Sequence, residues 1–73
     1  MPLEHAIPHI DNTFTYHAPK PGQPEVYELI RTHARGFAYT LEQHCPASRE
    51  LERAIEKLDE AVMLANAAIA RHG

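Results

Sequence analysis

The segment AVMLANAAIA, residues 61–70, constrains the fold of this chain more than any other stretch. It lies near the end of a longer helical pattern, SRELERAIEKLDEAVMLANAAIAR at 48–71, which is charged as far as Glu60 and has no further charge before Arg71. Asn66 is the only polar residue among the ten. A solitary surface helix keeps a polar face along its whole length, so this apolar half should be enclosed by other protein.

Two helices joined by a short turn are expected. Pro24 suits the start of a helix that runs to about residue 44. Pro46 ends this helix because a residue before proline is disfavoured in helical geometry. The second helix should begin near Ala47 or Ser48, with Ser48 as its cap. The connection is too short for anything except an antiparallel pair of helices, so the expected fold class is all-α.

Apolar residues recur at spacings of three and four in both expected helices, which gathers them into one stripe on each. In the first helix the stripe is Val26, Ile30, His33 or Ala34, Phe37, Leu41 and Cys45. In the second it is Leu51, Ala54, Ile55, Leu58, Ala61, Val62, Ala65 and Ile69. One partner helix cannot cover every side of residues 61–70, so we expect several copies to pack together as an oligomer.

The N-terminal region has a different character. Five of the six prolines lie between residues 2 and 24, and proline lacks the amide hydrogen that a helix interior needs. We therefore predict an extended N-terminal arm over residues 1–23 and a single helical-hairpin domain over residues 24–73. The stretch TFTYH at 13–17 has the composition of a strand, but no second strand-like run exists to pair with it, so we expect ordered coil.

Composition narrows the class of protein. A chain of 73 residues holds one small domain, and its single cysteine, Cys45, excludes an internal disulfide and a thiolate zinc site. The net charge of −3 argues against binding to a DNA or RNA polymer or to an anionic membrane. With no leader pattern and no apolar run long enough to span a bilayer, we expect a soluble, cytoplasmic protein.

Catalysis and metal binding are the weaker interpretations. Six histidines are present, but they lack the tight clustering that metal ligands need. Cys45 follows His44, yet sequence neighbours alone do not make a nucleophile and its base. We therefore expect no enzyme, no metal and no cofactor. The charges of the second helix are mostly three residues apart, as in Arg53 with Glu56 and Lys57 with Glu60, which is typical of a solvated face.

Two groups of basic residues could form a binding site. Arg31 and Arg35 lie one turn apart on the first helix, and the arm carries an aromatic ring with nearby basic groups at Tyr16, His17 and Lys20. If the arm folds back along a helix, the ring could stack on a base while the guanidinium groups bind phosphate. The alternative is that Tyr16 anchors packing and the arginines are surface charge. Arg71 could simply complement the negative end of the helix dipole.

The motifs PASRE at 46–50 and AIEKLDEAVMLANAAIAR at 54–71 resemble the helical-hairpin domain of the phage anti-CBASS cyclic-nucleotide sponges and of related inhibitors of Thoeris defence. The likeness extends, more weakly, over TYHAPKPGQPEVYELIR at 15–31. The resemblance implies a compact homo-hexamer that sequesters immune signals without cleaving them. It also implies two kinds of pocket, one for cyclic dinucleotides and one for cyclic trinucleotides.

The binding residues of the family's two pockets correspond to individual positions of this sequence. The dinucleotide pocket of the family uses an aromatic ring in the arm and a basic side chain in the first helix, which match Tyr16 and Arg31. Its trinucleotide pocket uses an arginine near the end of the last helix, which matches Arg71. That trinucleotide pocket also uses a hydroxyl in the first helix, two residues after the position that matches Arg31. This sequence has His33 there, with Thr32 next to it. The rival hypothesis is an oligomerisation or protein-interaction module with no nucleotide ligand.

Overall fold

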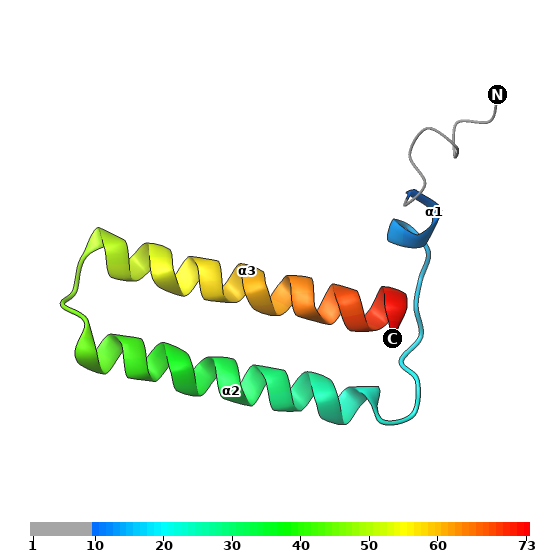
Figure 1. The fold of residues 1–73 in the computed structure, drawn as a ribbon, viewed down its shortest axis with the longest axis horizontal. Coiled ribbons are helices and arrows are strands. Elements are labelled where there is room, and N and C mark those ends of the chain that lie inside the picture. Colours follow the sequence, from blue (N-terminus) through cyan, green and yellow to red (C-terminus); the bar gives the residue numbers. More distant parts are fainter. Residues whose placement is uncertain (1–9) are drawn as a thin grey trace.

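A computed structural model describes residues 10–73, and this part of the chain consists of three helices, an arm and a turn (Figure 1). No strand occurs between residues 10 and 73, so the prediction of an all-α fold is confirmed for the described chain. The helices are α1 (Ile10–Thr13), α2 (Gln23–His44) and α3 (Arg49–His72).

Local chemistry sets the ends of the two long helices. Gly22 precedes α2 with a φ of 87°, a left-handed conformation that glycine adopts without steric cost, and a proline stands in the first turn. After α2, Cys45 is extended, with φ −105° and ψ 137°, as expected for a residue before proline. Ser48 caps α3: its side chain accepts a hydrogen bond of 3.1 Å from the amide of Leu51. The predicted cap is therefore confirmed.

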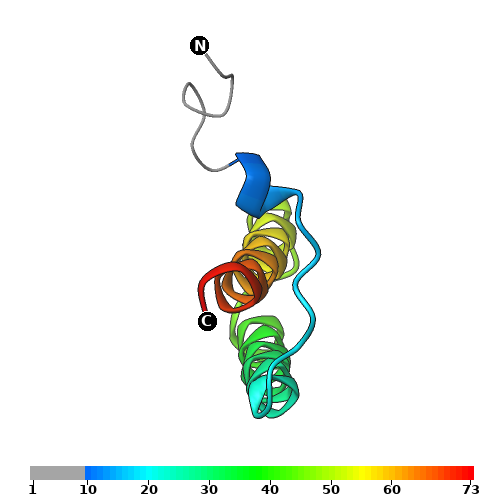
Figure 2. The ribbon, with the colours of Figure 1, turned by 90° about the vertical axis from the view of Figure 1, so that its right-hand side faces the viewer.

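The two long helices lie side by side, and the turn at residues 45–48 reverses the chain between them (Figures 1 and 2). At the opposite end of the pair, Nε2 of Gln23 donates a hydrogen bond of 3.3 Å to the carbonyl of Ile69. The start of α2 is thus held beside the end of α3.

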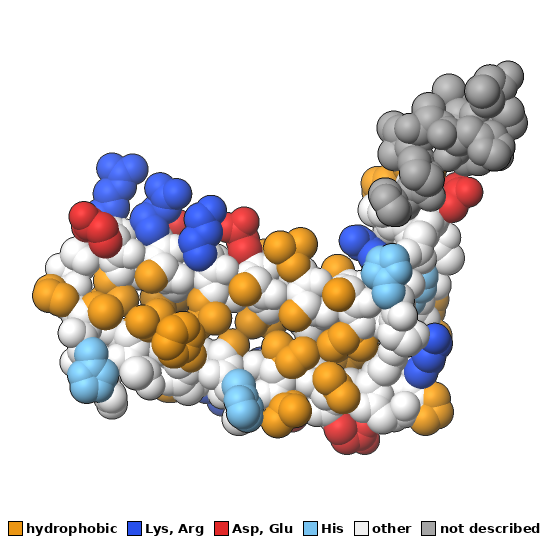
Figure 3. All heavy atoms as spheres, viewed as in Figure 1, with side chains coloured by type: hydrophobic (Ala, Val, Ile, Leu, Met, Phe, Trp, Pro, Cys, Tyr) orange, Lys and Arg blue, Asp and Glu red, His pale blue; other side chains and the backbone are white. Residues whose placement is uncertain are grey.

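Half-buried apolar side chains form the seam between α2 and α3, and Figure 3 shows hydrophobic groups along it. The stripe predicted for the second helix agrees with the structure except at Ala61, which is exposed. Its half-buried members are Leu51, Ala54, Ile55, Leu58, Val62, Ala65 and Ile69.

The stripe predicted for the first helix is partly wrong. Val26 is 41% exposed and Phe37 is 53% exposed. His33 and Cys45 are exposed too, whereas Tyr27 and Ala38 are half-buried. Two neighbouring rows of this helix both have spacings of three and four, because 3.6 residues make one turn. Spacing alone therefore could not decide which row faces α3.

The hairpin has no interior of its own. No residue between 10 and 73 is buried, and several large apolar side chains face outward, among them Leu29 at 56%, Met63 at 56% and Leu64 at 70% exposure. Two helices in contact bury one stripe each, and below about 70–80 residues such a core rarely supplies enough stability. The described chain therefore leaves much of its apolar surface uncovered.

The arm crosses the open end of the hairpin, from α1 past the end of α3 to the start of α2 (Figures 1 and 2). Residues 14–22 have no helix or strand, which confirms coil for most of TFTYH. The prediction of an extended arm is wrong at residues 10–13, which form the single turn α1. Thr13, the last residue of α1, is also the first residue of the TFTYH stretch. The arm before residue 10 lies outside the described residues.

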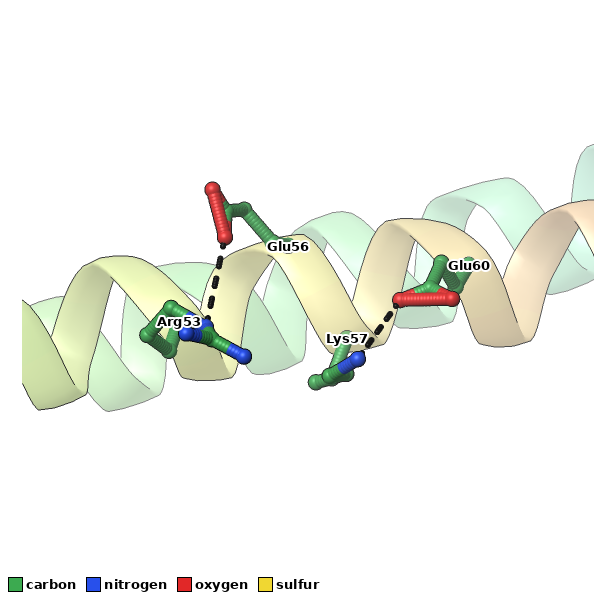
Figure 4. Close-up of polar contacts among 4 residues, drawn as sticks. All are labelled: Arg53, Glu56, Lys57 and Glu60. Atoms are coloured by element: carbon green, nitrogen blue, oxygen red, sulfur yellow. Dashed lines mark hydrogen bonds and ion pairs between the residues drawn. The ribbon is translucent and has the colours of Figure 1, made fainter.

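Exposed ion pairs cover the charged half of α3. Arg53 and Glu56 approach to 3.6 Å, and Lys57 and Glu60 to 3.1 Å (Figure 4). These two pairs agree with the predicted solvated face. Because all four side chains are more than half exposed, each pair contributes about 0–1 kcal/mol and keeps this half polar rather than holding the fold together.

Candidate functional site

Arg31 and Arg35 share one flank of the seam. They line a shallow hollow between the helices, and Asp59 of α3 lies on its other wall. The apolar remainder of the hollow is Ala34, Ala38, Ile55, Leu58 and Val62. Both arginines are exposed, and their spacing of one helical turn directs both guanidinium groups to the same side. The structure therefore brings these two predicted site residues together.

Arg31 also lines a second hollow nearer the open end of the hairpin. This hollow has a volume of about 710 Å³ and contains an aromatic ring, Tyr27, and an amide, Asn66. Its other residues are Asp59, Val62, Met63, Ala67 and Ala70. Arg31 is 3.2 Å from Glu28, but the two side chains are 56% and 68% exposed. Such a pair is weak in water, so it does not prevent the guanidinium from binding a phosphate.

The sequence assigned none of Asp59, Tyr27 and Asn66 to a binding site, although Asn66 stood out as the only polar residue of the segment 61–70. The hydrogen bond between Gln23 and Ile69 is one contact of the register of the two helices, and in this register Tyr27 and Asn66 line the same hollow. No hydrogen-bond partner within residues 10–73 reaches the buried Oδ1 atom of Asn66. These residues could have been found from the sequence only by knowing that register.

The arm residues lie apart from the arginines within one chain. Neither hollow lined by Arg31 includes a residue of the arm. Tyr16 is 84% exposed, and Nε2 of His17 lies 2.9 Å from the carbonyl of Asn12. The ammonium group of Lys20 donates to the carbonyl of Gly73. A single hairpin therefore does not bring the predicted ring and the predicted cations into one pocket.

The residues expected at a trinucleotide pocket lie on other surfaces. His33 lines an apolar groove with Leu29 and Phe37 of α2 and with Ala61 and Ala65 of α3. Residues 31 and 33 differ by about 200° around a helix, so this groove is on the opposite flank of the seam from the arginines.

Thr32 is exposed on α2, and Arg71 is exposed in the last turn of α3. The carbonyl of Arg71 accepts a 3.4 Å hydrogen bond from Asn12. The groove that contains His33 includes neither Thr32 nor Arg71. The three residues thus do not form one pocket within a single chain.

The described part of the chain contains no cluster of side chains that could bind a metal ion. Between residues 10 and 73, no three side chains of the types His, Cys, Asp or Glu gather where they could hold one ion. Cys45 is exposed at the turn.

In a comparison with protein families, the model described as "Acb2/Tad1, hairpin domain" matches residues 6–70. The chain belongs to this family. The Acb2/Tad1 proteins are the anti-CBASS and anti-Thoeris sponges, which sequester ligands, so membership indicates a sponge for cyclic nucleotide signals. The match includes most of the arm as well as the hairpin. Comparison with curated proteins and with solved structures finds no significant match.

The family assignment agrees with the resemblance found over PASRE and the alanine-rich segment. It also covers the arm segment that contains Tyr16, His17 and Lys20, over which the resemblance was weaker. Within the part of the chain that the structure describes, no helix is both long and apolar enough to cross a lipid bilayer.

Proposed function

We propose that this chain binds and sequesters cyclic dinucleotide and cyclic trinucleotide immune signals without cleaving them, and so inhibits CBASS-type defence in a bacterial cytoplasm. The observation that carries the proposal is the match to the sponge family over residues 6–70. The paired guanidinium groups of Arg31 and Arg35 support it, because planar guanidinium groups bind phosphates by two parallel hydrogen bonds.

The proposed functional unit is a homo-hexamer. A hairpin in which no residue from 10 to 73 is buried needs a further source of stability, and other copies of the chain can supply it. The apolar groove on the His33 flank, about 460 Å³ in volume, offers a surface for such a copy. Its alanines, Ala61 and Ala65, allow two backbones to approach closely.

The proposed dinucleotide pocket lies between subunits. Tyr16 is too exposed to have a role in packing within its own chain, and it does not line the hollows of Arg31. We therefore propose that the ring of one subunit meets the arginines of another, with His17 and Lys20 near the ring. A cyclic dinucleotide is nearly two-fold symmetric, so a two-fold interface presents it with two copies of each group.

The proposed trinucleotide pocket uses Arg71 with His33 and Thr32 from several subunits. Three copies of an arginine near a three-fold axis would match the three phosphates of a cyclic trinucleotide. Such a cluster of like charges is repulsive when empty, and a bound anion relieves the repulsion. Arg71 is exposed at a helix end and free of any ion pair among residues 10–73.

The sequestration step is tested by recovery of the ligand. Purified protein should deplete a cyclic dinucleotide from solution, and heat denaturation should return it to the supernatant chemically intact, as measured by chromatography and mass spectrometry. A changed nucleotide would show an enzyme. No depletion would contradict the proposal and favour a protein-interaction module.

Assembly is tested at Ala61, which lines the apolar groove but is exposed in the single hairpin. Ala61→Glu should leave the helices intact and reduce the mass in solution from six times 8.2 kDa, because burying a carboxylate at an interface is costly. Light scattering at micromolar concentration gives the mass. Ala47→Glu, at the exposed turn, is the control. A monomeric parent protein would refute the hexamer and both inter-subunit pockets.

The dinucleotide pocket is tested at Tyr16 and Arg31. Tyr16→Ala removes a stacking surface and Arg31→Ala removes a phosphate contact, so each should weaken cyclic dinucleotide binding at least tenfold, about 1.4 kcal/mol. Isothermal titration calorimetry measures the affinity. Tyr39→Ala and Arg49→Ala, exposed residues at the turn end of the hairpin, are matched controls. A variant that binds within a factor of two of the parent would return its residue to a structural role.

The separation of the two pockets is tested at Arg71. Arg71→Ala should abolish cyclic trinucleotide binding and leave dinucleotide binding unchanged, because the arginine supplies charge to one pocket only. His72→Ala at the same helix end is the control. Saturating the protein with one ligand should not displace the other in a competition titration. Mutual displacement would instead show one shared pocket.

A further inference from the structure

Hydrogen bonds tie the arm to α3 on both sides of Tyr16. Before it, Nδ2 of Asn12 donates to the carbonyl of Arg71 over 3.4 Å. After it, the ammonium group of Lys20 donates to the carbonyl of Gly73. The ring between these two anchors is 84% exposed. The backbone of this segment is therefore held while its aromatic side chain stays accessible.

The end of α3 explains why the arm lies there. The last four carbonyl groups of an α-helix have no partner further along the helix, so they need donors from elsewhere. Asn12 of the arm provides such a donor to the carbonyl of Arg71, and Lys20 donates to the carbonyl of Gly73, just after the helix. Gln23 donates to the carbonyl of Ile69, which also accepts the backbone amide of Gly73. The arm is thus hydrogen-bonded to the carbonyls at the open end of the hairpin.

Gln23 connects all three parts at this end. Its Oε1 atom accepts a 2.9 Å hydrogen bond from the backbone amide of Lys20, and its Nε2 atom donates over 3.3 Å to the carbonyl of Ile69. The side chain is half-buried. A Cβ atom at Gly73 would lie only 2.9 Å from Nε2 of Gln23, so little free space surrounds the amide. One side chain therefore joins the arm, the first turn of α2 and the last turn of α3.

We propose that Gln23 is a positioning residue for cyclic dinucleotide binding: it fixes the arm so that the ring of Tyr16 is already in place when the ligand arrives. This inference rests on the proposed function and on the role of Tyr16 in it. A group that is ordered before binding loses less conformational entropy when it binds, which increases affinity. Gln23 itself does not touch the ligand.

A double-mutant cycle separates this role from a general structural one. Gln23→Ala should weaken cyclic dinucleotide binding at least tenfold in calorimetry. In a protein that already carries Tyr16→Ala, the same change should weaken binding by no more than a factor of two, because no ring remains to be positioned. Gln23→Glu keeps the acceptor but loses the donor to Ile69, so its loss should be intermediate.

Gln43→Ala is the matched control, because Gln43 is exposed in the last turn of α2, at the other end of the hairpin. Circular dichroism and light scattering should show the same helix content and mass for every variant. Without any ligand, hydrogen exchange at the Lys20 amide should be at least tenfold faster in Gln23→Ala, because that amide loses its acceptor.

Two outcomes overturn the inference. The first is a Gln23→Ala protein that binds as tightly as the parent. The second is a double variant in which the losses from Gln23→Ala and Tyr16→Ala simply multiply. A parent protein that binds no cyclic dinucleotide overturns the proposed function instead. In that case the exchange measurement at Lys20 still reports whether Gln23 holds the arm.

Discussion

The shortage of burial in a two-helix hairpin is the constraint on which the rest of this structure depends. The helices meet along one seam, and the side chains on that seam are only half-buried. An isolated pair of helices has no third element to close the seam from either flank. Each flank therefore remains an open surface with its own chemistry, available to another subunit or to a ligand.

The two flanks of the seam differ in charge. One carries Arg31 and Arg35 with Asp59 opposite them, and the other is lined by apolar groups around His33. The difference follows from helical periodicity, because residues two apart point to nearly opposite sides. A small fold can in this way separate a surface suited to association from one suited to an anionic ligand. The carboxylate of Asp59 also limits how positive the basic flank becomes.

Sequence patterns predicted the helices well because their ends depend on local chemistry. Pro24, Pro46 and Ser48 act on their immediate neighbours, so α2 and α3 begin and end close to the predicted residues. The residues that form the seam were harder to predict. In α3 the charged residues leave one candidate row, whereas in α2 the rows containing Val26 and Tyr27 fit the spacing equally well, and only contact with α3 distinguishes them.

In the candidate site too, local spacing was predictable from the sequence, whereas contacts between distant residues were not. The proximity of Arg31 to Arg35 follows from a spacing of four on one helix, and the structure agrees. The position of Tyr16 depends on bonds between residues far apart in the chain, such as those from Asn12 to Arg71 and from Lys20 to Gly73. No local pattern encodes these contacts. The helical turn of α1 was not predicted either, because the prolines elsewhere in the arm favoured an extended chain.

The bonds between the arm and the end of α3 also have a consequence for biosynthesis. The arm leaves the ribosome before the two long helices do, whereas its acceptors on residues 69–73 are made after them. The hairpin can close at the Pro46 turn as soon as α3 emerges, whereas the arm must wait until the last turn of α3 exists. In a growing chain the exposed ring of Tyr16 therefore reaches its final place only after α3 is complete.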